Sequence, residues 1–483
     1  MARTPTISPQ NKDVRGKATS SAATAPLLPS NLTTDVLLLS TYELGRQPFG
    51  LASPAAWLRG AGARVTCADL SIEDFPAAAA SAADLVAFFL PMHTATRLAA
   101  PLIPRIREFN PNAHICCYGL YGPTNAAYLN SLGVQTVIGG EFETGLLRLC
   151  DGLSRNRSDP GAGDTHISLD RQQFEVPDRS GLPELSRYAE LRTGDGQPRI
   201  VGYTEASRGC KHLCRHCPVV PVYNGIFRIV QADVVLADVE RQVEAGAGHI
   251  TFGDPDFFNG IGHAVAIVEG LHERFPELSY DVTIKIEHLL KYADRIPLLR
   301  DTGCAFVTSA VESSDDRVLE LLEKNHTRED FIRVATLFRD NDFVLNPTFV
   351  TFSPWTTISS YIDLLELTLE LELVDNVAAI QWAIRLLIPA GSRLLELAET
   401  KSILLPYAAD RLGYPWAHPD PEVDELFDAV FEIVCRSGDE RRETFARVWD
   451  AAHRAAGSST PQIDRYLPTS LSAIPYLTEP WYC

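Results

Sequence analysis

The sequence predicts an α/β protein with two series of parallel strands and a small helical C-terminal region. Short apolar runs of strand length alternate with segments of helical spacing over residues 31–155, and again over residues 199–400. Such alternation is typical of parallel sheets covered by helices. From residue 401 to 483 the pattern changes to helices and loops rich in proline and aromatic residues.

The first series predicts a five-stranded, doubly wound sheet, with helical segments at 55–61 and 94–109. Its expected strands are the apolar runs 35–41, 64–68, 84–90, 114–119 and 135–138. The segment 156–198 that follows is rich in Gly, Pro, Asp, Ser and Arg and has little periodicity. We therefore expect it to be an irregular linker.

The second series predicts six βα units. Its expected strands are 200–206, 249–253, 280–286, 305–311, 344–351 and 378–387, and its helical segments include 233–245, 315–323, 328–339 and 358–371. Six units are too few for a closed eight-fold barrel, so a partial barrel is expected. In barrels of parallel strands the chemistry lies at the C-terminal strand ends.

Composition and charge narrow the function classes. The chain has 43 Lys plus Arg against 62 Asp plus Glu, and its net charge of -19 argues against a broad nucleic-acid footprint. No run of about 18 apolar residues exists, so no membrane span is expected. Residues 1–30 are rich in Ala, Ser, Thr and Pro and are expected to be a disordered tail. Ten dispersed cysteines in a chain of 483 residues do not form the dense pattern of a disulfide framework, which indicates a cytoplasmic location.

Three cysteines are clustered. Cys210, Cys214 and Cys217 have CxxxCxxC spacing and directly follow the first expected strand of the second series. Thiolates are soft ligands that favour iron–sulfur clusters, zinc or Cu(I). A structural zinc ion takes four protein ligands, and His212 or His216 is available as the fourth, so a zinc site is the main alternative.

This motif at a strand end resembles the radical SAM (S-adenosylmethionine) superfamily, whose barrel is a partial TIM-type (βα)6 barrel. The resemblance implies that the three thiolates bind a [4Fe–4S] cluster and leave one iron open to SAM. One electron from the cluster then cleaves SAM and yields a 5′-deoxyadenosyl radical, a reaction carried by the cofactors. An external electron donor of the flavodoxin or ferredoxin type is expected as a partner.

The resemblance also implies SAM contacts at the second and fourth strand ends, before the third cysteine and on the sixth strand. The corresponding residues here are His216, Gly253, Asp254, Glu312, Ser313 and Arg385. The usual Gly-Gly-Glu is absent, and Gly253 and Asp254 stand in its place. Two alternatives stay open: Asp254 as a cap in a βα turn, and Arg385 in a structural salt bridge, since a charge within a strand needs a partner.

The first series resembles the Rossmann-like domain of the cobalamin-dependent radical SAM subclass, where the corrinoid lies between that domain and the barrel. Glycines follow the fourth and fifth strands, and strand C-termini are where doubly wound sheets bind ligands. The residues that the resemblance assigns to cobalamin are Gly119, Gly139, Gly140 and Glu141. The DxHxxG motif that supplies a cobalt ligand in many such domains is missing, and His93 does not stand in that motif. The alternative is a domain that only shapes the substrate pocket.

The expected function is therefore radical SAM chemistry, with cobalamin-dependent methyl transfer to a small molecule or peptide. One alternative is a cobalamin-independent rearrangement or hydrogen abstraction, and another is a non-catalytic zinc-binding interaction protein. Methylthiotransferases, with three further cluster cysteines in the N-terminal domain, are a rival class. Two observations count against this class: Cys116 and Cys117 are adjacent within one expected strand, and the acidic net charge disfavours a tRNA substrate.

The last residues are Trp481, Tyr482 and Cys483. The architecture resembles the radical SAM family named for a CUAEP or CCAEP tail, which would begin at Cys483. The resemblance implies that a UGA selenocysteine codon after Cys483 was read as a stop. A simple terminal cysteine is the alternative.

Overall fold

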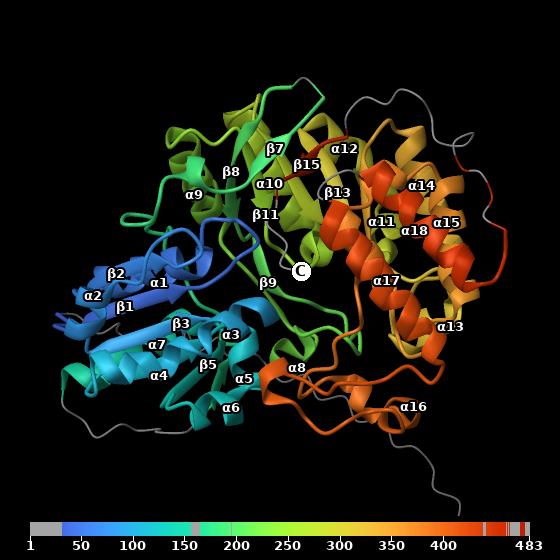
Figure 1. Ribbon diagram of the computed structural model, residues 1–483. Coiled ribbons are helices and arrows are strands. Elements are labelled where there is room, and N and C mark those ends of the chain that lie inside the picture. The colour runs from blue at the N-terminus through green and yellow to red at the C-terminus, as the bar shows by residue number, and fades with distance from the viewer. Residues whose placement is uncertain are drawn as a thin grey trace, which may run out of the picture.

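In the computed structural model, two α/β lobes lie side by side (Figure 1). The structure describes residues 31–155, 165–194, 196–437, 441–459, 461, 463 and 474–478. The expected disordered tail 1–30 and the C-terminal Trp481, Tyr482 and Cys483 lie outside these residues.

The N-terminal lobe is a parallel sheet with the strand order β2-β1-β3-β4-β5-β6. The five expected strands are all present. Four of them are short apolar runs that are buried on both faces, as is typical of parallel strands, whereas the edge strand β2 is exposed over its first half. Their bounds are β1 Asp35–Ser40, β2 Arg64–Asp69, β3 Leu85–Phe89, β4 His114–Tyr118 and β5 Thr136–Gly140.

Helices cover both faces of this sheet, and each face has its own hydrophobic cluster. One face packs against α1 (Phe49–Gly60) and α7 (Phe142–Ser154). The other helices are short: α2 Ala77–Ala82, α3 His93–Ala99, α4 Leu102–Phe109, α5 Tyr121–Thr124 and α6 Ala126–Ser131. The lobe is therefore doubly wound, as expected.

The segment after residue 155 is more regular than its composition predicts. Thr165–Ser168 forms β6, which pairs in parallel with β5 and extends the first sheet. A 3-10 turn at Leu185–Arg187 and the strand β7 (Glu190–Arg192) follow. Arg59 of α1 pairs with Asp178, so this segment is fastened to the first lobe.

The second lobe is a half-barrel with the strand order β14-β13-β12-β11-β8 in parallel, and β7 and β15 (Tyr476–Leu477) added antiparallel at one edge. The parallel strands are β8 Arg199–Thr204, β11 His249–Phe252, β12 Ser279–Thr283, β13 Cys304–Glu312 and β14 Leu345–Phe349. The expectation of a sixth strand at 378–387 is wrong. Ala379–Ala383 is a 3-10 helix, and a single bridge joins Arg385 to Phe352.

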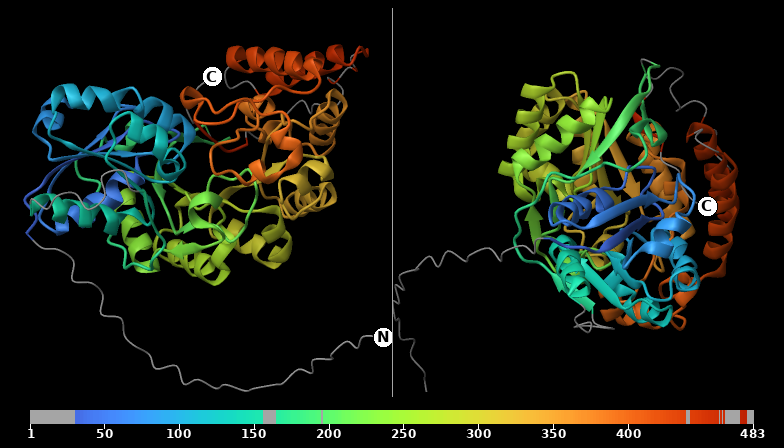
Figure 2. Two further views of the ribbon diagram at one scale, coloured as in Figure 1. Left: turned by 90° about the horizontal axis from the view of Figure 1, so that it is seen from below. Right: turned by 90° about the vertical axis from the view of Figure 1, so that its left-hand side faces the viewer.

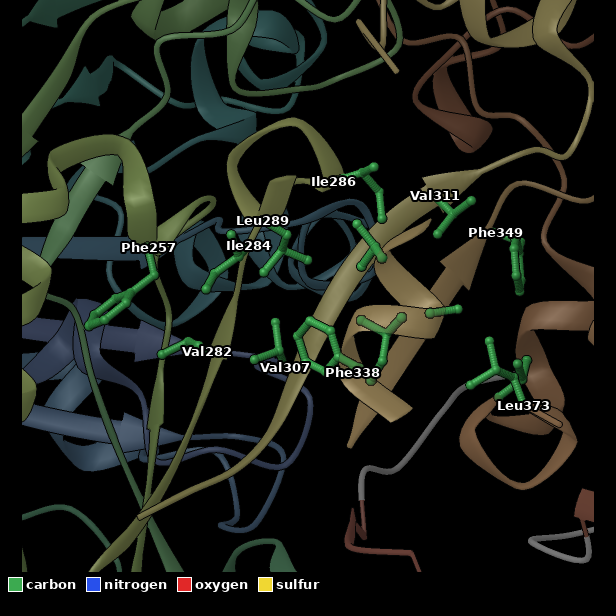
Figure 3. Close-up of a cluster of buried hydrophobic side chains, with 14 of the residues drawn as sticks. Phe257, Val282, Ile284, Ile286, Leu289, Val307, Val311, Phe338, Phe349 and Leu373 are labelled. Carbon is green, nitrogen blue, oxygen red and sulfur yellow. The ribbon is translucent and has the colours of Figure 1, made fainter. Parts of the chain in front are cut away.

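Helices line the outside of the half-barrel and enclose the main hydrophobic core, seen between strands and helices in Figure 3. Val282, Val307 and Phe338 in that view are at most 1% exposed. The longer helices are α9 Ala232–Glu244, α10 Ile261–Arg274, α14 Arg328–Asp340 and α15 Ile358–Glu370. The shorter ones are α8 Val220–Tyr223, α11 Ile286–Lys291, α12 Ile296–Asp301, α13 Asp316–Leu321 and α16 Ala398–Lys401. Three short 3-10 turns lie at Phe257–Gly260 (η2), Ala293–Arg295 and Val374–Asn376.

The C-terminal region is helical, as expected. Helices α17 (Pro421–Ser437) and α18 (Arg441–Ala455) pack together along the outside of the second lobe (Figure 2). Two 3-10 turns, Arg393–Glu396 and Ala409–Arg411, precede them. Among the described residues, no helix has the length and apolar character that a membrane crossing demands.

Candidate active site

The cysteine loop starts where the first half-barrel strand ends. After β8, the short strand β9 (Ser207–Gly209) leads into Cys210, and β10 (Phe227–Ile229), which pairs with β9 antiparallel, follows the loop. Gly209 has a φ of +75°, and a Cβ there would lie 2.4 Å from the carbonyl oxygen of Ile226. Only glycine therefore fits directly before the first cysteine.

Contacts from two other strand ends hold this loop. The side-chain amide oxygen of Asn259, after β11, lies 3.9 Å from Cys210 Sγ and accepts the Lys211 N–H at 3.2 Å. The Arg215 N–H donates to the carbonyl of Leu322 at 3.0 Å, after β13. The loop is thus placed over the C-terminal edge of the half-barrel, where the sequence predicted it.

The three thiols need a cation to ionise. Cys210 and Cys214 are buried, and burial raises the pKa of the Cys217 thiol to about 12. Metal ligation deprotonates a thiol, so a positively charged iron–sulfur core bound here would supply the missing compensation. The residues therefore fit the cluster that the motif implies.

The spacing of the ligand atoms fits a cluster better than a single zinc ion. Within the described chain, the group of metal-binding side chains whose ligand atoms lie within 4.8 Å of one another contains Cys210, His212 and Asp256, but neither Cys214 nor Cys217. Tetrahedral zinc with Zn–S bonds of about 2.3 Å would bring its sulfur ligands within about 4 Å of each other. The zinc alternative on the three cysteines is therefore disfavoured.

His216 and Glu312 come together as expected. His216 Nε2 lies 3.1 Å from Glu312 Oε1, and Lys324 Nζ lies 3.3 Å from the same oxygen. Burial raises the pKa of Glu312, but Lys324 and then His216 outweigh it and lower the pKa to about 2. Glu312 is ionised and buried at the end of β13, where its φ of +71° places a non-glycine residue in the left-handed region. Such backbone strain costs about 1–3 kcal/mol and clusters at functional sites.

Gly253 and Asp254 lie at the end of β11 but serve the protein itself. Asp254 is 2% exposed and accepts the Ala206 N–H at 2.9 Å and the Ser207 hydroxyl at 2.5 Å. These bonds tie β11 to the turn before the cysteine loop, so Asp254 positions that loop. A Cβ on Gly253 would lie 1.8 Å from the Tyr203 hydroxyl.

Arg385 does not join this group. Its guanidinium pairs with Asp424 of α17 at 2.8 Å and stacks on Trp416, with 3.9 Å between Cζ and the ring centroid. Arg385 therefore forms a structural salt bridge, which was the open alternative to a SAM contact, and this salt bridge fastens the C-terminal helices. Ser313 follows Glu312, and its hydroxyl accepts the Asp315 N–H at 3.1 Å, so it shapes the turn into α13.

The C-terminal edge of the first sheet faces the cysteine loop. Leu120, directly after β4, packs against the cluster of Cys210, Val219, Val222 and Tyr223. Strand ends of the two sheets therefore meet across the loop. Doubly wound sheets bind ligands at this edge.

The protein's own atoms fill the space beside the three glycines that the resemblance assigns to cobalamin. A Cβ on Gly140, whose φ is +71°, would lie 2.2 Å from the Ser168 carbonyl oxygen of β6. On Gly139 it would lie 2.3 Å from Pro123, and on Gly119 3.0 Å from the Leu90 carbonyl. Close packing accounts for these glycines without a ligand.

Glu141 is part of a buried ion network centred on Arg208. Arg208 contacts Glu141 at 3.4 Å, Glu143 at 2.7 Å and Glu205 at 2.6 Å, and the arginine side chain is 6% exposed. The Tyr223 hydroxyl donates to Glu141 at 3.2 Å. Burial, partly offset by Arg208, raises the pKa of Glu141 to about 7.

Two oxygen atoms at the same sheet edge are buried without a hydrogen-bond partner among the described residues: Ser40 Oγ and Glu43 Oε2. Unpaired buried oxygen atoms are costly, which makes this loop after β1 the part of the edge that fits a bound group best. His93, in contrast, is used by the protein, because its Nε2 lies 2.8 Å from the Arg411 carbonyl oxygen.

A cavity of about 300 Å³ lies inside the half-barrel. Its walls combine uncharged polar side chains with apolar ones such as Phe252 and Phe306, and the charged members are Asp254, Asp281, Arg46 and Arg441. The polar groups include Thr251, Thr283, Thr308, Asn346, Thr348, Asn376 and Gln381. Its size and lining suit a small polar molecule.

The cysteines of the first lobe are part of its core. Cys116 and Cys117 belong to the hydrophobic clusters on opposite faces of the sheet, and Cys67 and Cys150 are buried beside Cys116. Burial raises the pKa of both Cys67 and Cys150 to about 12. Thiols in this setting are inert, so the second cluster of a methylthiotransferase finds no ligand set among them.

Arg208, Asn259 and Lys324 are site residues to which the sequence assigned no role. Arg208 and Asn259 stand near segments that were selected, two residues before Cys210 and five after Asp254. Apart from Glu205, three residues before Arg208, their partners come from distant segments, so no local pattern reveals them.

Comparison with known proteins identifies one domain of the chain. Residues 204–368 match the Radical SAM superfamily. A probable threonylcarbamoyladenosine tRNA methylthiotransferase of Archaeoglobus fulgidus is 23% identical over 171 residues, covering 33% of this chain and 40% of that protein. The hopanoid C-2 methylase of Rhodopseudomonas palustris is 23% identical over 166 residues, covering 34% and 29%. The matches thus span less than half of either relative.

Two solved structures share the fold across both lobes. The cobalamin-dependent SAM radical enzyme OxsB, with aqua-cobalamin and SAM bound, has a TM-score of 0.64 at 13% identity and covers 87% of this chain and 71% of that one. The radical SAM methyltransferase TsrM from Kitasatospora setae, with cobalamin and a [4Fe–4S] cluster bound, has a TM-score of 0.62 at 16% identity and covers 91% and 92%. The chain is therefore an enzyme with a radical SAM domain in residues 204–368. The expected resemblance to the cobalamin-binding subclass is confirmed at the level of the fold.

Proposed function

We propose that this enzyme binds a [4Fe–4S] cluster through Cys210, Cys214 and Cys217 and cleaves SAM beside it. The observation that carries the proposal is the position of the three thiols, in a loop held over the C-terminal edge of the half-barrel by Asn259 and Leu322. When bound, the cluster and SAM supply a 5′-deoxyadenosyl radical.

The chain's own residues bind and orient SAM in this proposal. Glu312 stays ionised through Lys324 and His216, and its carboxylate can accept hydrogen bonds from ribose hydroxyls. The His216 ring, next to Cys217, offers a flat face for adenine. The polar cavity inside the half-barrel holds the substrate, which favours a small molecule over a peptide because its volume is about 300 Å³.

We further propose that cobalamin binds between the C-terminal edge of the first sheet and the cysteine loop, and that the reaction is methyl transfer. The fold likeness to OxsB and TsrM supports this, as does the pair of unpartnered oxygen atoms on Ser40 and Glu43. Gly119, Gly139, Gly140 and Glu141 have protein partners, so their contribution is to shape this edge. A cobalamin-independent rearrangement is the second candidate, and the close packing of those glycines favours it.

Anaerobic reconstitution tests the first proposal. Cys210→Ala, Cys214→Ala or Cys217→Ala should each abolish the iron–sulfur absorbance and the release of 5′-deoxyadenosine from SAM. Cys304→Ala and Cys435→Ala are matched controls outside the loop and should retain both. If a triple Cys→Ala protein at these three positions still cleaved SAM, the proposal would be overturned.

Corrinoid retention tests the second proposal. The full chain, incubated with hydroxocobalamin and passed through gel filtration, should retain about one corrinoid per chain. The triple Cys→Ala protein should retain it as well, because the site lies mainly on the first lobe. No retention by either protein would favour the cobalamin-independent reaction.

A further inference from the structure

Both lobes line the polar cavity of the half-barrel, and the first lobe does so through the loop after β1. Leu44 and Arg46 of this loop lie in the cavity wall. Leu44 has a φ of +53°, in the left-handed region, and Gly45 follows at +74°. Backbone strain at a non-glycine residue such as Leu44 clusters at ligand-binding positions. The Gly45 carbonyl accepts the Ala189 N–H at 2.8 Å, so the loop presents Arg46 to the cavity in a fixed position.

Two guanidinium groups stand in the cavity wall, each against an aromatic ring. Arg46 lies over the Tyr203 ring, with 5.4 Å between Cζ and the ring centroid. Arg441, at the start of α18, lies over the Tyr476 ring at 5.1 Å and donates to the Asp375 carbonyl. A guanidinium has five N–H donors in a planar fork that matches a carboxylate, so it binds such a ligand in addition to its contacts with the protein.

The two carboxylates in the wall are engaged by the protein. Asp281 Oδ1 accepts the Thr251 hydroxyl at 2.6 Å and lies 2.9 Å from His249 Nε2. Each oxygen of Asp254 accepts one hydrogen bond, and burial raises the pKa of this carboxyl to about 7. Because Asp254 is partly protonated near neutral pH, the two arginines leave the wall with a net charge between 0 and about +1. This balance suits a monoanion better than a doubly charged phosphate.

One hydrogen-bonding atom in the wall is unused within the described part of the chain. The side-chain amide oxygen of Asn346, on β14, is buried and has no hydrogen-bond partner there. Asn346 pairs in register with Thr308, which stands four residues before Glu312 on β13. A buried acceptor without a partner is costly, so its place in the wall indicates a donor on the bound molecule, on the strand that leads to the SAM residue.

We propose that this cavity binds a small monocarboxylate that also carries a hydroxyl or an amino group. The guanidinium of Arg46 holds the carboxylate, in a wall that Arg441 makes more positive, and the hydroxyl or amino group donates to Asn346. Arg46 and Asn346 line the same cavity of about 300 Å³, which is small enough for one molecule to contact both. The role of this molecule as the substrate rests on the proposed function, whereas its binding does not.

Thermal unfolding of the reconstituted full-length protein tests the carboxylate contact. The probes are L-lactate, L-mandelate, L-alanine and L-phenylalanine, each compared with its primary amide at equal ionic strength. At saturation at least one acid should raise the Tm by about 2 °C or more, and its amide should not. Arg46→Gln should abolish this shift, Arg46→Lys should keep part of it, and Arg441→Gln should reduce it. Arg333→Gln, exposed on α14, is the control and should keep the full shift. Acids that raise the Tm no more than their amides, or shifts that survive Arg46→Gln, would overturn the proposal.

Asn346→Leu tests the second contact. Wild-type protein should bind mandelate about tenfold more tightly than phenylacetate, or phenylalanine about tenfold more tightly than 3-phenylpropionate, and the pair that differs shows which donor the site takes. Asn346→Leu should remove this preference, and its absence from wild type would reject the contact. Iron content and 5′-deoxyadenosine release are measured on the same samples. Carboxylate binding without SAM cleavage would support the binding site and refute the proposed function.

Discussion

Arg208 Nη2 lies 2.7 Å from Glu143 Oε1, and this buried pair joins the two lobes next to the cysteine loop. Glu143 belongs to α7 of the first lobe, whereas Arg208 lies in β9, two residues before Cys210. The guanidinium also lies over the rings of Phe49, Phe142 and Phe174. Arg208 therefore helps to fix the position of the loop relative to the first sheet, together with the hydrogen bond from Tyr223 to Glu141.

Replacing Arg208 should destabilise the protein strongly. Arg208→Met leaves Glu143 buried beside Glu141 and Glu205 without their cation, and breaking a buried pair in this way costs about 3–5 kcal/mol. Urea denaturation of the cluster-free protein should show this loss in the free energy of unfolding. Arg64→Met, at an exposed pair with Asp35, is the matched control and should cost about 1 kcal/mol or less. Equal losses in both variants would show that the network does not hold the lobes together.

The same network predicts a pH dependence centred on Glu141. Its carboxyl group faces Arg208, Glu143, Glu205 and Tyr223, and burial raises its pKa from 4.5 to about 7. Between about pH 4.5 and 7 the folded protein keeps a proton on Glu141 that the unfolded chain has lost. The free energy of unfolding therefore falls as pH rises through this window, by up to about 1.4 kcal/mol per pH unit from this group.

Glu141→Gln removes this contribution because the amide does not titrate. The difference in unfolding free energy between variant and wild type should therefore shift in favour of the variant as pH rises from 4.5 to 7. Urea denaturation at half-unit pH steps measures it. Glu240→Gln, exposed on α9, should give a curve parallel to that of wild type. A parallel curve for Glu141→Gln would mean that Glu141 is ionised throughout.

Local sequence patterns predicted most of the strands because most are short apolar runs that are largely buried. The prediction failed where tertiary packing decides. Residues 378–387 are as apolar as a strand, but Trp382 is buried against Phe445 of α18, and Ala379–Ala383 coils into a 3-10 helix to allow it. Conversely, Thr165–Ser168 carries no apolar run, and backbone pairing with β5 makes it a strand.

The candidate site also contains residues that local patterns reveal and residues whose contacts are decided by tertiary packing. The cysteine spacing is a local signal. The family resemblance selected His216 and Glu312 one by one, and their contact with each other is seen only in the structure. Asp254 and Glu141 lie at strand ends, where the sequence placed them, but their partners, Ser207 and Arg208, are determined by the packing of distant segments. Arg385 needed a partner, as a buried charge does, but Asp424 on α17 had no sequence signal that linked it to that position.

Lys324 offers a test of the SAM site that leaves the cysteines unchanged. Lys324→Met keeps the side-chain length and removes the cation that holds the Glu312 pKa low. Without this cation only His216 opposes the effect of burial, so the pKa of Glu312 rises and the carboxylate binds ribose hydroxyls less strongly. The Kd for SAM should rise about tenfold, which is about 1.4 kcal/mol. Equilibrium dialysis with the reconstituted protein measures this, and the iron content should stay at about four per chain. Lys401→Met, exposed on α16, is the control. An unchanged Kd for Lys324→Met would remove Glu312 from the site.

Two glycine-to-alanine variants test how tightly the sheet edge that faces the cysteine loop is packed. Gly140 lies at that edge, and Gly152 in helix α7 is the control. Gly140→Ala places a Cβ 2.2 Å from the Ser168 carbonyl oxygen at a φ of +71°. The left-handed backbone alone costs an L-residue about 1–2 kcal/mol, and β6 must also move away from β5. Gly152→Ala lies within helix α7 with nothing within 4 Å of the new methyl group, so it should stabilise the protein by about 0.5–1 kcal/mol. Urea denaturation of the cluster-free variants should therefore show shifts of opposite sign. If Gly140→Ala were as stable as wild type, β6 would not be docked on β5, and the glycine would be free to contact a ligand instead.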